Sequence, residues 1–204
     1  MPSGIECVVF DVGETLVDES RYWTDLAIRA GVTPLTLCAV LGSLIERGES
    51  HTQLWDALGV SRPQTQASIE TTDLYEDALD CVAAARRAGF SVGIAGNQPA
   101  GVEALLRDAG FDADFIASSA AWRVAKPARG FFDRLIAQAR VAAPKILYVG
   151  DRLDNDVLPA REAGMRTASI RRGPWGHLHA RRPEAALADL RVDSLAELAR
   201  IFNR

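Results

Sequence analysis

The chain has 204 residues, of which 48% are hydrophobic and 25% charged, and its formal net charge is −4. This length allows one substantial hydrophobic core with a small insertion, and the composition is that of an ordinary globular protein. The negative charge disfavours a nucleic-acid binder, which needs a basic face. No apolar run approaches the length of a membrane-spanning helix, so we expect no membrane partner.

The three cysteines are Cys7, Cys38 and Cys81. Each has apolar neighbours, so we expect buried free thiols, and no CxxC or Cys/His spacing suggests a zinc site. The first residues carry no basic stretch, and their apolar run ends at Asp11, unlike a secretory signal. These features favour the cytoplasm.

Short apolar runs, most of them rich in Val and Ile, alternate with segments of helical spacing. The expected strands are residues 7–10, 91–95, 114–117, 146–149 and 167–170. The expected helices are residues 73–88, 99–109, 128–140 and 153–163. Alternation of this kind is typical of right-handed βαβ units. The sequence therefore predicts an α/β fold with a Rossmann-like, doubly wound parallel sheet, and a short strand or turn followed by a helix from Ser194 at the end of the chain.

One block after the first strand contains only helical segments. Helices are expected at residues 21–30, 34–47 and 52–58, and the polar segment 61–72 would lead back to the sheet. We therefore expect a core formed by residues 1–15 and 73–204, with residues 16–72 as a helical cap.

Polar residues follow the predicted strands at the edge where a doubly wound sheet binds its ligand. Asp11 follows the first strand and Gly96-Asn97 the second. Lys126 follows the third, and Gly150-Asp151 the fourth, with Asp156 a few residues further on.

This combination of residues suits phosphoryl transfer. Asp11 and Asp151 offer the hard oxygen ligands that Mg²⁺ prefers, and Lys126 adds a compact positive charge for phosphoryl oxygens. Gly96 and Gly150 would let backbone N–H groups approach an oxyanion. Attack by Asp11 would give an aspartyl-phosphate that water then hydrolyses.

The segments FDVGETLVD, AGN, KP and VGDRLDND, in this order, resemble motifs one to four of the haloacid dehalogenase-like hydrolase superfamily. The helical block after the first motif resembles that family's C1 cap. The resemblance implies a Mg²⁺-dependent hydrolase of a small phosphorylated substrate, with Asp11 as nucleophile and Lys126 as its cationic partner. It also implies metal binding by Asp11, Asp151, the backbone carbonyl of Gly13, and Asp156, the last directly or through water.

Two positions depart from the family pattern. Gly13 replaces the usual second aspartate, which protonates the leaving group, and loss of such an acid costs a factor of about 10²–10⁴ in rate. Glu14 is a possible substitute, although its neighbouring position points it elsewhere. Gly96 replaces the usual Ser or Thr, so a phosphate contact is missing or is supplied by backbone N–H groups and Asn97.

Several residues have simpler interpretations. Asp156 also suits the N-terminus of a helix, and Asn97 could cap the helix at 99–109. The aromatic and histidine residues of the block are typical of a cap core as well as of a substrate pocket: Tyr22, Trp23, His51 and Trp55. We expect His177 and His179 to be loop histidines, and the pairs Arg171-Arg172 and Arg181-Arg182 to be solvated loop charges.

Three functions remain open from the sequence. The first is a Mg²⁺-dependent phosphatase. The second is a 2-haloacid dehalogenase, whose known members also lack the second aspartate but need no metal. The third is a non-catalytic binding protein that keeps the fold. A site that has lost its catalytic activity, however, has no physical need for a buried cluster of charges.

Overall fold

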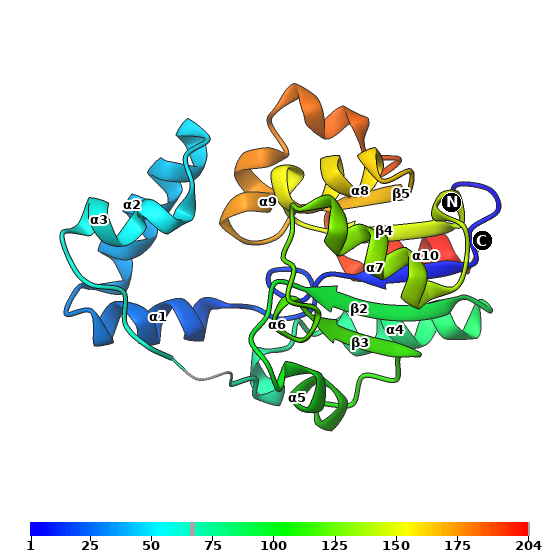
Figure 1. Cartoon of the computed structure of the whole chain (residues 1–204), viewed down its shortest axis with the longest axis horizontal. Coiled ribbons are helices and arrows are strands. Elements are labelled where there is room, and N and C mark those ends of the chain that lie inside the picture. The colour runs from blue at the N-terminus through cyan, green and yellow to red at the C-terminus, as the bar shows by residue number, and fades with distance from the viewer. Residues whose placement is uncertain (66–67, 204) are drawn as a thin grey trace.

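A parallel sheet forms the centre of the molecule. In the computed structural model, which describes residues 1–65 and 68–203, it has six strands in the order β3-β2-β1-β4-β5-β6 (Figure 1). The strands are β1 (Cys7–Phe10), β2 (Ser91–Gly96), β3 (Phe115–Ser118), β4 (Ile146–Gly150), β5 (Arg166–Ile170) and β6 (Leu190–Val192). All neighbouring strands pair parallel. The predicted doubly wound α/β fold is confirmed.

Side chains of the central strand alternate between two hydrophobic layers, as the pleat of a strand requires. Val8 and Phe10 pack on the layer covered by α4 (Ala78–Arg87), α5 (Val102–Asp108) and α10 (Leu195–Phe202). Cys7 and Val9 pack on the layer covered by α7 (Arg129–Ala139) and α8 (Leu158–Glu162). Because both faces are buried, the strands have apolar runs instead of alternating polar residues.

Some helices begin later than the sequence suggests. The helix expected from residue 73 begins at Ala78, because residues 71–73 form a short 3₁₀ turn and Leu74 pairs with Val17 in an isolated β-bridge. The helix expected from residue 99 begins at Val102, after Gly101 with φ 92°.

The segment expected as one helix at residues 153–163 is divided in two. It forms a π-helical turn, η4 (Leu153–Val157), followed by α8. The Arg152 carbonyl accepts hydrogen bonds from the N–H groups of both Asp156 and Val157, which widens this turn. Pro159 in the first turn of α8 has no N–H to donate. The turn therefore changes the direction of the side chains that follow β4.

A helical unit follows β1, as expected. It consists of α1 (Ser20–Arg29), α2 (Pro34–Arg47), a 3₁₀ turn at His51–Gln53 and α3 (Leu54–Leu58). Thr33 caps α2 by accepting a hydrogen bond from Thr36 N at 3.1 Å, and Gly48, with φ 70°, ends it. Figure 1 shows this unit beside the sheet, away from the helices that cover it. Residues 66–67 of the expected linker lie outside the described residues.

The helical unit packs against a helix of the sheet domain that the sequence did not predict. This helix, α9 (Gly173–His179), places Trp175 in the unit's hydrophobic cluster with Leu37, Leu41 and Trp55. A second unpredicted helix, α6 (Ser119–Trp122), follows β3.

Of the pair Arg181-Arg182, Arg181 is 65% exposed in a turn, as expected of a solvated loop charge, whereas Arg182 is half-buried. Arg181 lies 2.9 Å from Glu46, and Arg182 donates to the Ile45 carbonyl at 2.5 Å. Arg182 thus links the chain after α9 to the C-terminal end of α2, and the Arg181–Glu46 pair beside it is solvent-exposed.

The three cysteines differ in burial. Cys7 and Cys81 are buried free thiols, as expected, whereas Cys38 is exposed on α2, so that prediction was wrong. In the described ranges 1–65 and 68–203, no single helix has the length and apolar character needed to cross a membrane. The helices α1 and α2 meet those criteria only as a pair, and they are bent by 111° relative to each other.

Candidate active site

The site lies where the order of the strands reverses. The chain adds β2 and β3 on one side of β1 and then returns to place β4 on the other side. Asp11 follows β1 and Asp151 follows β4, so both carboxylates stand at the carboxyl ends of these two neighbouring strands. The Asp11 N–H donates to the Val149 carbonyl at 2.8 Å, which fixes the first carboxylate against β4.

Lys126 enters the same site from the loop between β3 and α7. Its Nζ lies 2.7 Å from Asp11 Oδ1 and 2.5 Å from Asp156 Oδ1, and the residue is only 4% exposed. Asn97 holds this loop, because its Nδ2 donates to the Lys126 carbonyl at 2.9 Å and its Oδ1 accepts from Lys126 N at 2.8 Å. Asn97 therefore orients the lysine and does not cap α5, which Gly101 precedes.

Asp156 is brought to the site by the π-helical turn. Its Oδ1 faces Lys126, and its Oδ2 accepts from Arg152 N at 3.0 Å. Gly150 makes room for it, since a Cβ on residue 150 would lie 2.5 Å from the Asp156 Cγ. We had expected Gly150 to expose a backbone N–H to an anion, but the contact that requires glycine here is the close approach of Asp156.

The pKa values in the cluster follow from burial and from the balance of charge. Burial would lower the pKa of Lys126, but the carboxylates of Asp11 and Asp156 raise it well above its usual range, so the amine stays protonated. Burial raises the pKa of Asp11 to about 6 against the opposing effect of Lys126. Burial and the charges of Asp156 and Asp11 also raise the pKa of Asp151 well above its usual range. The positive charge of the neighbouring Arg152 opposes this rise without reversing it.

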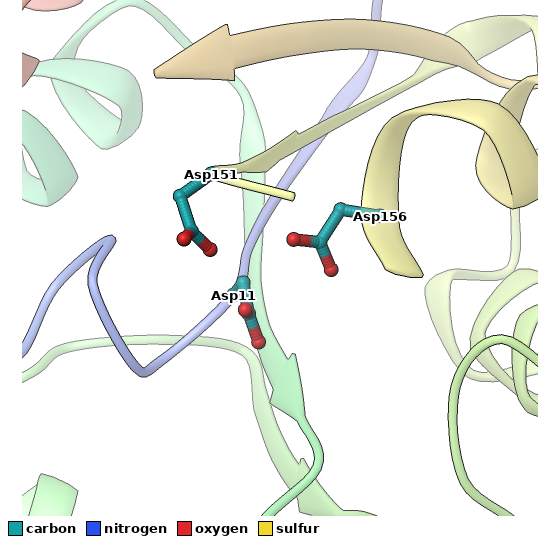
Figure 2. Close-up of side chains that lie close together, drawn as sticks. All are labelled: Asp11, Asp151 and Asp156. Atoms are coloured by element: carbon teal, nitrogen blue, oxygen red, sulfur yellow. The ribbon is translucent and has the colours of Figure 1, made fainter. Parts of the chain in front are cut away.

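The residues fit a divalent cation. Asp11, Asp151 and Asp156 are all buried, and each offers a carboxylate oxygen within 4.8 Å of the others. Figure 2 shows the three carboxylates converging from β1, from the end of β4 and from the turn after it. Asp151 Oδ2 is buried and has no hydrogen-bond partner in the described part of the chain. With all three ionised, the cluster holds two more negative than positive charges, which Mg²⁺ would neutralise.

Gly96 stands too close to Asp11 to carry a side chain in this arrangement. A Cβ there would lie 2.5 Å from Asp11 Oδ1 and 3.2 Å from Val12 Cγ2. The sequence suggested a missing hydroxyl at this position. The structure gives the physical reason, because the Asp11 carboxylate, held by Lys126, occupies that space.

Glu14, a candidate for the missing acid, is engaged elsewhere. Its backbone has φ 52°, and its side chain is 6% exposed. Oε2 accepts from Tyr75 O–H at 2.6 Å, and Oε1 accepts from Glu19 N at 3.2 Å. Burial raises its pKa, and the hydrogen bond from Tyr75 opposes that rise. Glu14 thus joins the loop after β1 to the segment before α4.

A cavity of about 500 Å³ lies between the site and the helical unit. Its wall includes Asp11, Gly13, Lys126 and Asp151 from the sheet domain. From the helical unit it includes, among others, Glu19, Tyr22, Trp23 and His51. Trp55 is 8% exposed and packs in the hydrophobic cluster of the unit instead.

Three cavity residues were missed by sequence reasoning. Trp175 of α9 and Arg152 line the cavity together, with the guanidinium carbon 4.5 Å from the indole centroid. Glu19 precedes α1 and belongs to no motif. Burial, with the charges of Glu14 and Asp11, raises the pKa of Glu19 to about 7. Only its place directly after FDVGETLVD could have drawn attention to it.

The two histidines near the end of the chain do not lie in a loop. Both are on α9, with His177 exposed and His179 3% exposed. His179 Nδ1 accepts a hydrogen bond from Leu153 N at 3.1 Å. Within the described residues, the potential metal cluster consists of aspartates alone, so neither histidine belongs to one.

Arg172 also differs from the expectation for its pair. Its Nη2 lies 2.5 Å from Asp77 Oδ2, and the two side chains are 11% and 13% exposed. Its guanidinium also stacks on Tyr75, with the carbon 4.1 Å from the ring centroid, and donates to the Thr15 carbonyl at 3.1 Å. Arg172 is therefore half-buried and supports the loop after β1, whereas Arg171 is exposed.

The fold and the site together define a class of protein: a doubly wound α/β protein with a buried acidic cluster at its strand switch point and a helical unit that forms the other wall of the cavity. Residues 123–198 match a family model described as HAD-hydrolase-like. A glyceraldehyde 3-phosphate phosphatase from Methanocaldococcus jannaschii is 32% identical over 90 residues, which are 44% of this chain and 38% of the relative. The match thus spans well under half of that relative's length.

Solved structures match nearly the whole chain. The putative HAD-hydrolase YfnB from Bacillus subtilis, bound to magnesium, has a TM-score of 0.70 at 18% identity, covering 98% of this chain and 99% of that one. An L-2-haloacid dehalogenase from Xanthobacter autotrophicus has a TM-score of 0.68 at 20% identity, covering 98% of each chain. At these identities the two structures establish the fold. The family match over residues 123–198 and the partial match to the phosphatase make the chain similar to the haloacid dehalogenase-like hydrolases, in agreement with the four motifs.

Proposed function

We propose that the chain is a Mg²⁺-dependent phosphatase that acts on a small phosphorylated metabolite through an aspartyl-phosphate on Asp11. The observation that carries this proposal is the buried cluster of three aspartates and Lys126 beside a 500 Å³ cavity. The phosphatase name of the Methanocaldococcus jannaschii relative supports the same class of reaction.

Each residue of the site would have its own role in this reaction. Asp11 attacks the phosphorus atom, and Lys126 holds Asp11 in place and offsets negative charge on the phosphoryl group. Asn97 lines the cavity and fixes the lysine loop, and Gly96 keeps the space in which the Asp11 carboxylate stands. These roles require the carboxyl ends of β1, β2 and β4 to lie at the same edge, and the parallel pairing of these strands places them there.

Mg²⁺ would be held by Asp11 and Asp151, with the carbonyl of Gly13 and with Asp156 directly or through water. The unpartnered Oδ2 of Asp151 supports this ligand set. When bound, the ion screens the repulsion between the anionic phosphate and the attacking carboxylate.

The helical unit, residues 16–72, would act as the cap over a core of residues 1–15 and 73–204. Its side chains form one wall of the cavity, and would select the substrate. Trp175, which lies in the core part of the chain, joins the cap's hydrophobic cluster and gives the cap a surface on which to rest. The free cysteines fit a reducing compartment, and we propose the cytoplasm.

A second candidate is a 2-haloacid dehalogenase. Gly13 favours it, because a reaction at carbon needs no acid for a halide that leaves as an anion. The acidic cluster with the orphaned Asp151 oxygen argues against it, since a metal-free site would keep a buried charge without compensation.

The test is hydrolysis of p-nitrophenyl phosphate with and without Mg²⁺, by the wild-type protein and by Asp11→Asn. The proposal expects turnover that requires the metal and is lost in Asp11→Asn. Halide release from a 2-haloacid without metal would replace it with the dehalogenase function. Absence of both reactions would leave a non-catalytic binding protein and overturn the proposal.

A further inference from the structure

The space beside Gly13 is already filled by another carboxyl group. A Cβ added to residue 13 would lie 2.7 Å from Glu19 Cδ and 3.2 Å from Glu19 Oε2, and closer still to Oε1. Glu19 therefore stands where a side chain of residue 13 would begin. Gly13, Glu19 and Asp11 line the same cavity.

The Glu19 carboxyl is held in this position by its surroundings. Trp23, one turn along α1, donates from Nε1 to Oε2 at 3.3 Å. The Glu19 N–H donates to Glu14 Oε1 at 3.2 Å, and Glu14 in turn accepts from Tyr75. Oε1, the oxygen nearest Gly13, has no hydrogen-bond partner in the described part of the chain. One oxygen is thus fixed, and the other is available to a bound molecule.

The burial of Glu14 explains how Glu19 comes so close. The Glu14 side chain occupies a space next to Gly173, where a Cβ on residue 173 would lie 2.5 Å from Glu14 Cγ. From there it anchors the backbone at Glu19, which is the N-cap residue of α1. Glycine at 13, glycine at 173 and the buried Glu14 are all needed for this placement.

We propose that Glu19 is the catalytic residue that protonates the leaving group, in place of the acidic side chain that Gly13 lacks. This inference rests on the proposed phosphatase function and extends its substrates to alkyl phosphate monoesters, whose leaving oxygen needs a proton. The acid would then be supplied by the start of the helical unit instead of the loop that carries the nucleophile.

The two half-reactions balance. An Asp11 carboxylate oxygen bonds to phosphorus as the bond between phosphorus and the ester oxygen breaks, and that oxygen takes the proton of the Glu19 carboxyl to leave as an alcohol. A water molecule then attacks phosphorus and gives its proton to the Glu19 carboxylate, and the bond between phosphorus and the Asp11 oxygen breaks. Phosphate leaves, and the Asp11 carboxylate and the Glu19 acid are restored.

The test uses two substrates that share a ring but differ in leaving group, with Mg²⁺ present. p-Nitrophenyl phosphate releases a phenolate that needs no proton donor, whereas p-nitrobenzyl phosphate releases an alkoxide that does. In Glu19→Gln, which keeps size and hydrogen bonding, we expect kcat/KM for the benzyl ester to fall by about 10²–10⁴, the range for loss of a general acid. For the phenyl ester, kcat/KM should stay unchanged.

A second readout reports the later step. Since Glu19→Gln also lacks the base for water, the first turnover of the phenyl ester should release one nitrophenolate per active site in a burst, followed by slow turnover with lowered kcat. Asp56→Asn, a carboxylate change at an exposed position on α3 of the same helical unit and outside the cavity wall, is the matched control and should leave kcat/KM unchanged for both esters. The double variant Gly13→Asp with Glu19→Ala should recover benzyl ester hydrolysis relative to Glu19→Ala.

The outcomes separate this inference from the proposed function. If wild type hydrolyses only the phenyl ester, or if Glu19→Gln lowers kcat/KM equally for both esters, Glu19 is not the acid and the phosphatase proposal stands. If wild type hydrolyses neither ester with Mg²⁺, the phosphatase proposal fails and this inference fails with it.

Discussion

Lys126 Nζ lies 2.5 Å from Asp156 Oδ1, and the two side chains are 1% and 0% exposed. A buried ion pair of this kind is costly to break, because the remaining charge has lost its hydration and cannot regain it. Asp11 also contacts Lys126, so the lysine would keep one partner if Asp156 were replaced.

Asp156→Asn should lower the free energy of unfolding by roughly 3 kcal/mol, the lower end for a broken buried pair, because Asp11 remains. The substitution keeps an acceptor for Arg152 N, so the loss reports the missing charge. Urea denaturation measures it. Asp133→Asn removes the exposed pair with Arg129, whose side chains are 55% and 61% exposed, and should cost less than about 0.5 kcal/mol. Equal losses in the two variants would contradict the burial argument.

Asp151→Asn should have opposite effects without and with Mg²⁺. The native pKa of Asp151 is raised, so its charge destabilises the folded protein at pH values above the unfolded pKa. Without metal at neutral pH, the variant should therefore melt at a higher temperature than wild type. This gain should vanish at acidic pH, where the carboxyl is protonated in both states.

With Mg²⁺ added, wild type should gain thermal stability by mass action, and Asp151→Asn should lose most of that gain because it removes a ligand charge. Thermal melts in a metal titration measure both effects without any substrate. A metal-dependent shift of the same size in wild type and variant would show that Asp151 does not bind the ion.

Gly96→Ala should impair catalysis although it adds only one methyl group. The added carbon would meet Asp11 Oδ1 at 2.5 Å and would push the carboxylate away from Lys126. We expect kcat/KM for p-nitrophenyl phosphate to fall at least roughly tenfold, since a displaced nucleophile loses alignment. Gly130→Ala in the first turn of α7 is the control, because its Cβ meets Val124 Cγ2 at an ordinary 3.5 Å. That variant should keep full activity.

The sequence predicts the sheet well because each strand is an isolated apolar run with a glycine or a polar residue after it. The bounds of β1 and α2 agree with the expectation to the residue, and β2 and β4 extend one residue further. The residues brought together at the strand ends also follow from pattern alone, since parallel strands end at one edge: Asp11, Lys126, Asp151 and Asp156.

The sequence fails where a contact distant along the chain decides the local structure. Gly173, Pro174 and Gly176 suggest a loop, yet α9 forms because Trp175 is buried against the helical unit. Arg172 looks like exposed charge until Asp77, distant in the chain, is placed beside it. The sequence does not predict Glu19 as a site residue for the same reason, because only the folded loop brings its carboxyl group to Gly13.

His179→Asn should make the stability of the protein less sensitive to acid. Burial lowers the pKa of His179 to about 4, against the opposing charge of Asp154, from an unfolded value near 6.5. As the pH falls through 6.5, His179 becomes protonated in the unfolded chain but stays neutral in the folded protein. Stability present above that pH is therefore lost on acidification, and the loss ends near pH 4, at roughly 3 kcal/mol.

Asparagine keeps an acceptor for Leu153 N but does not titrate. Between about pH 7.5 and pH 5, the variant should consequently lose about 2 kcal/mol less unfolding free energy than wild type, measured by urea denaturation at each pH. The carboxylates of the active site contribute equally to both proteins and cancel in this difference. His177→Asn changes an exposed imidazole on the same helix and should leave the wild-type pH dependence intact. If His179→Asn and wild type lose the same free energy, His179 is protonated in the folded protein, and its Nδ1 cannot be the acceptor that holds the turn after β4.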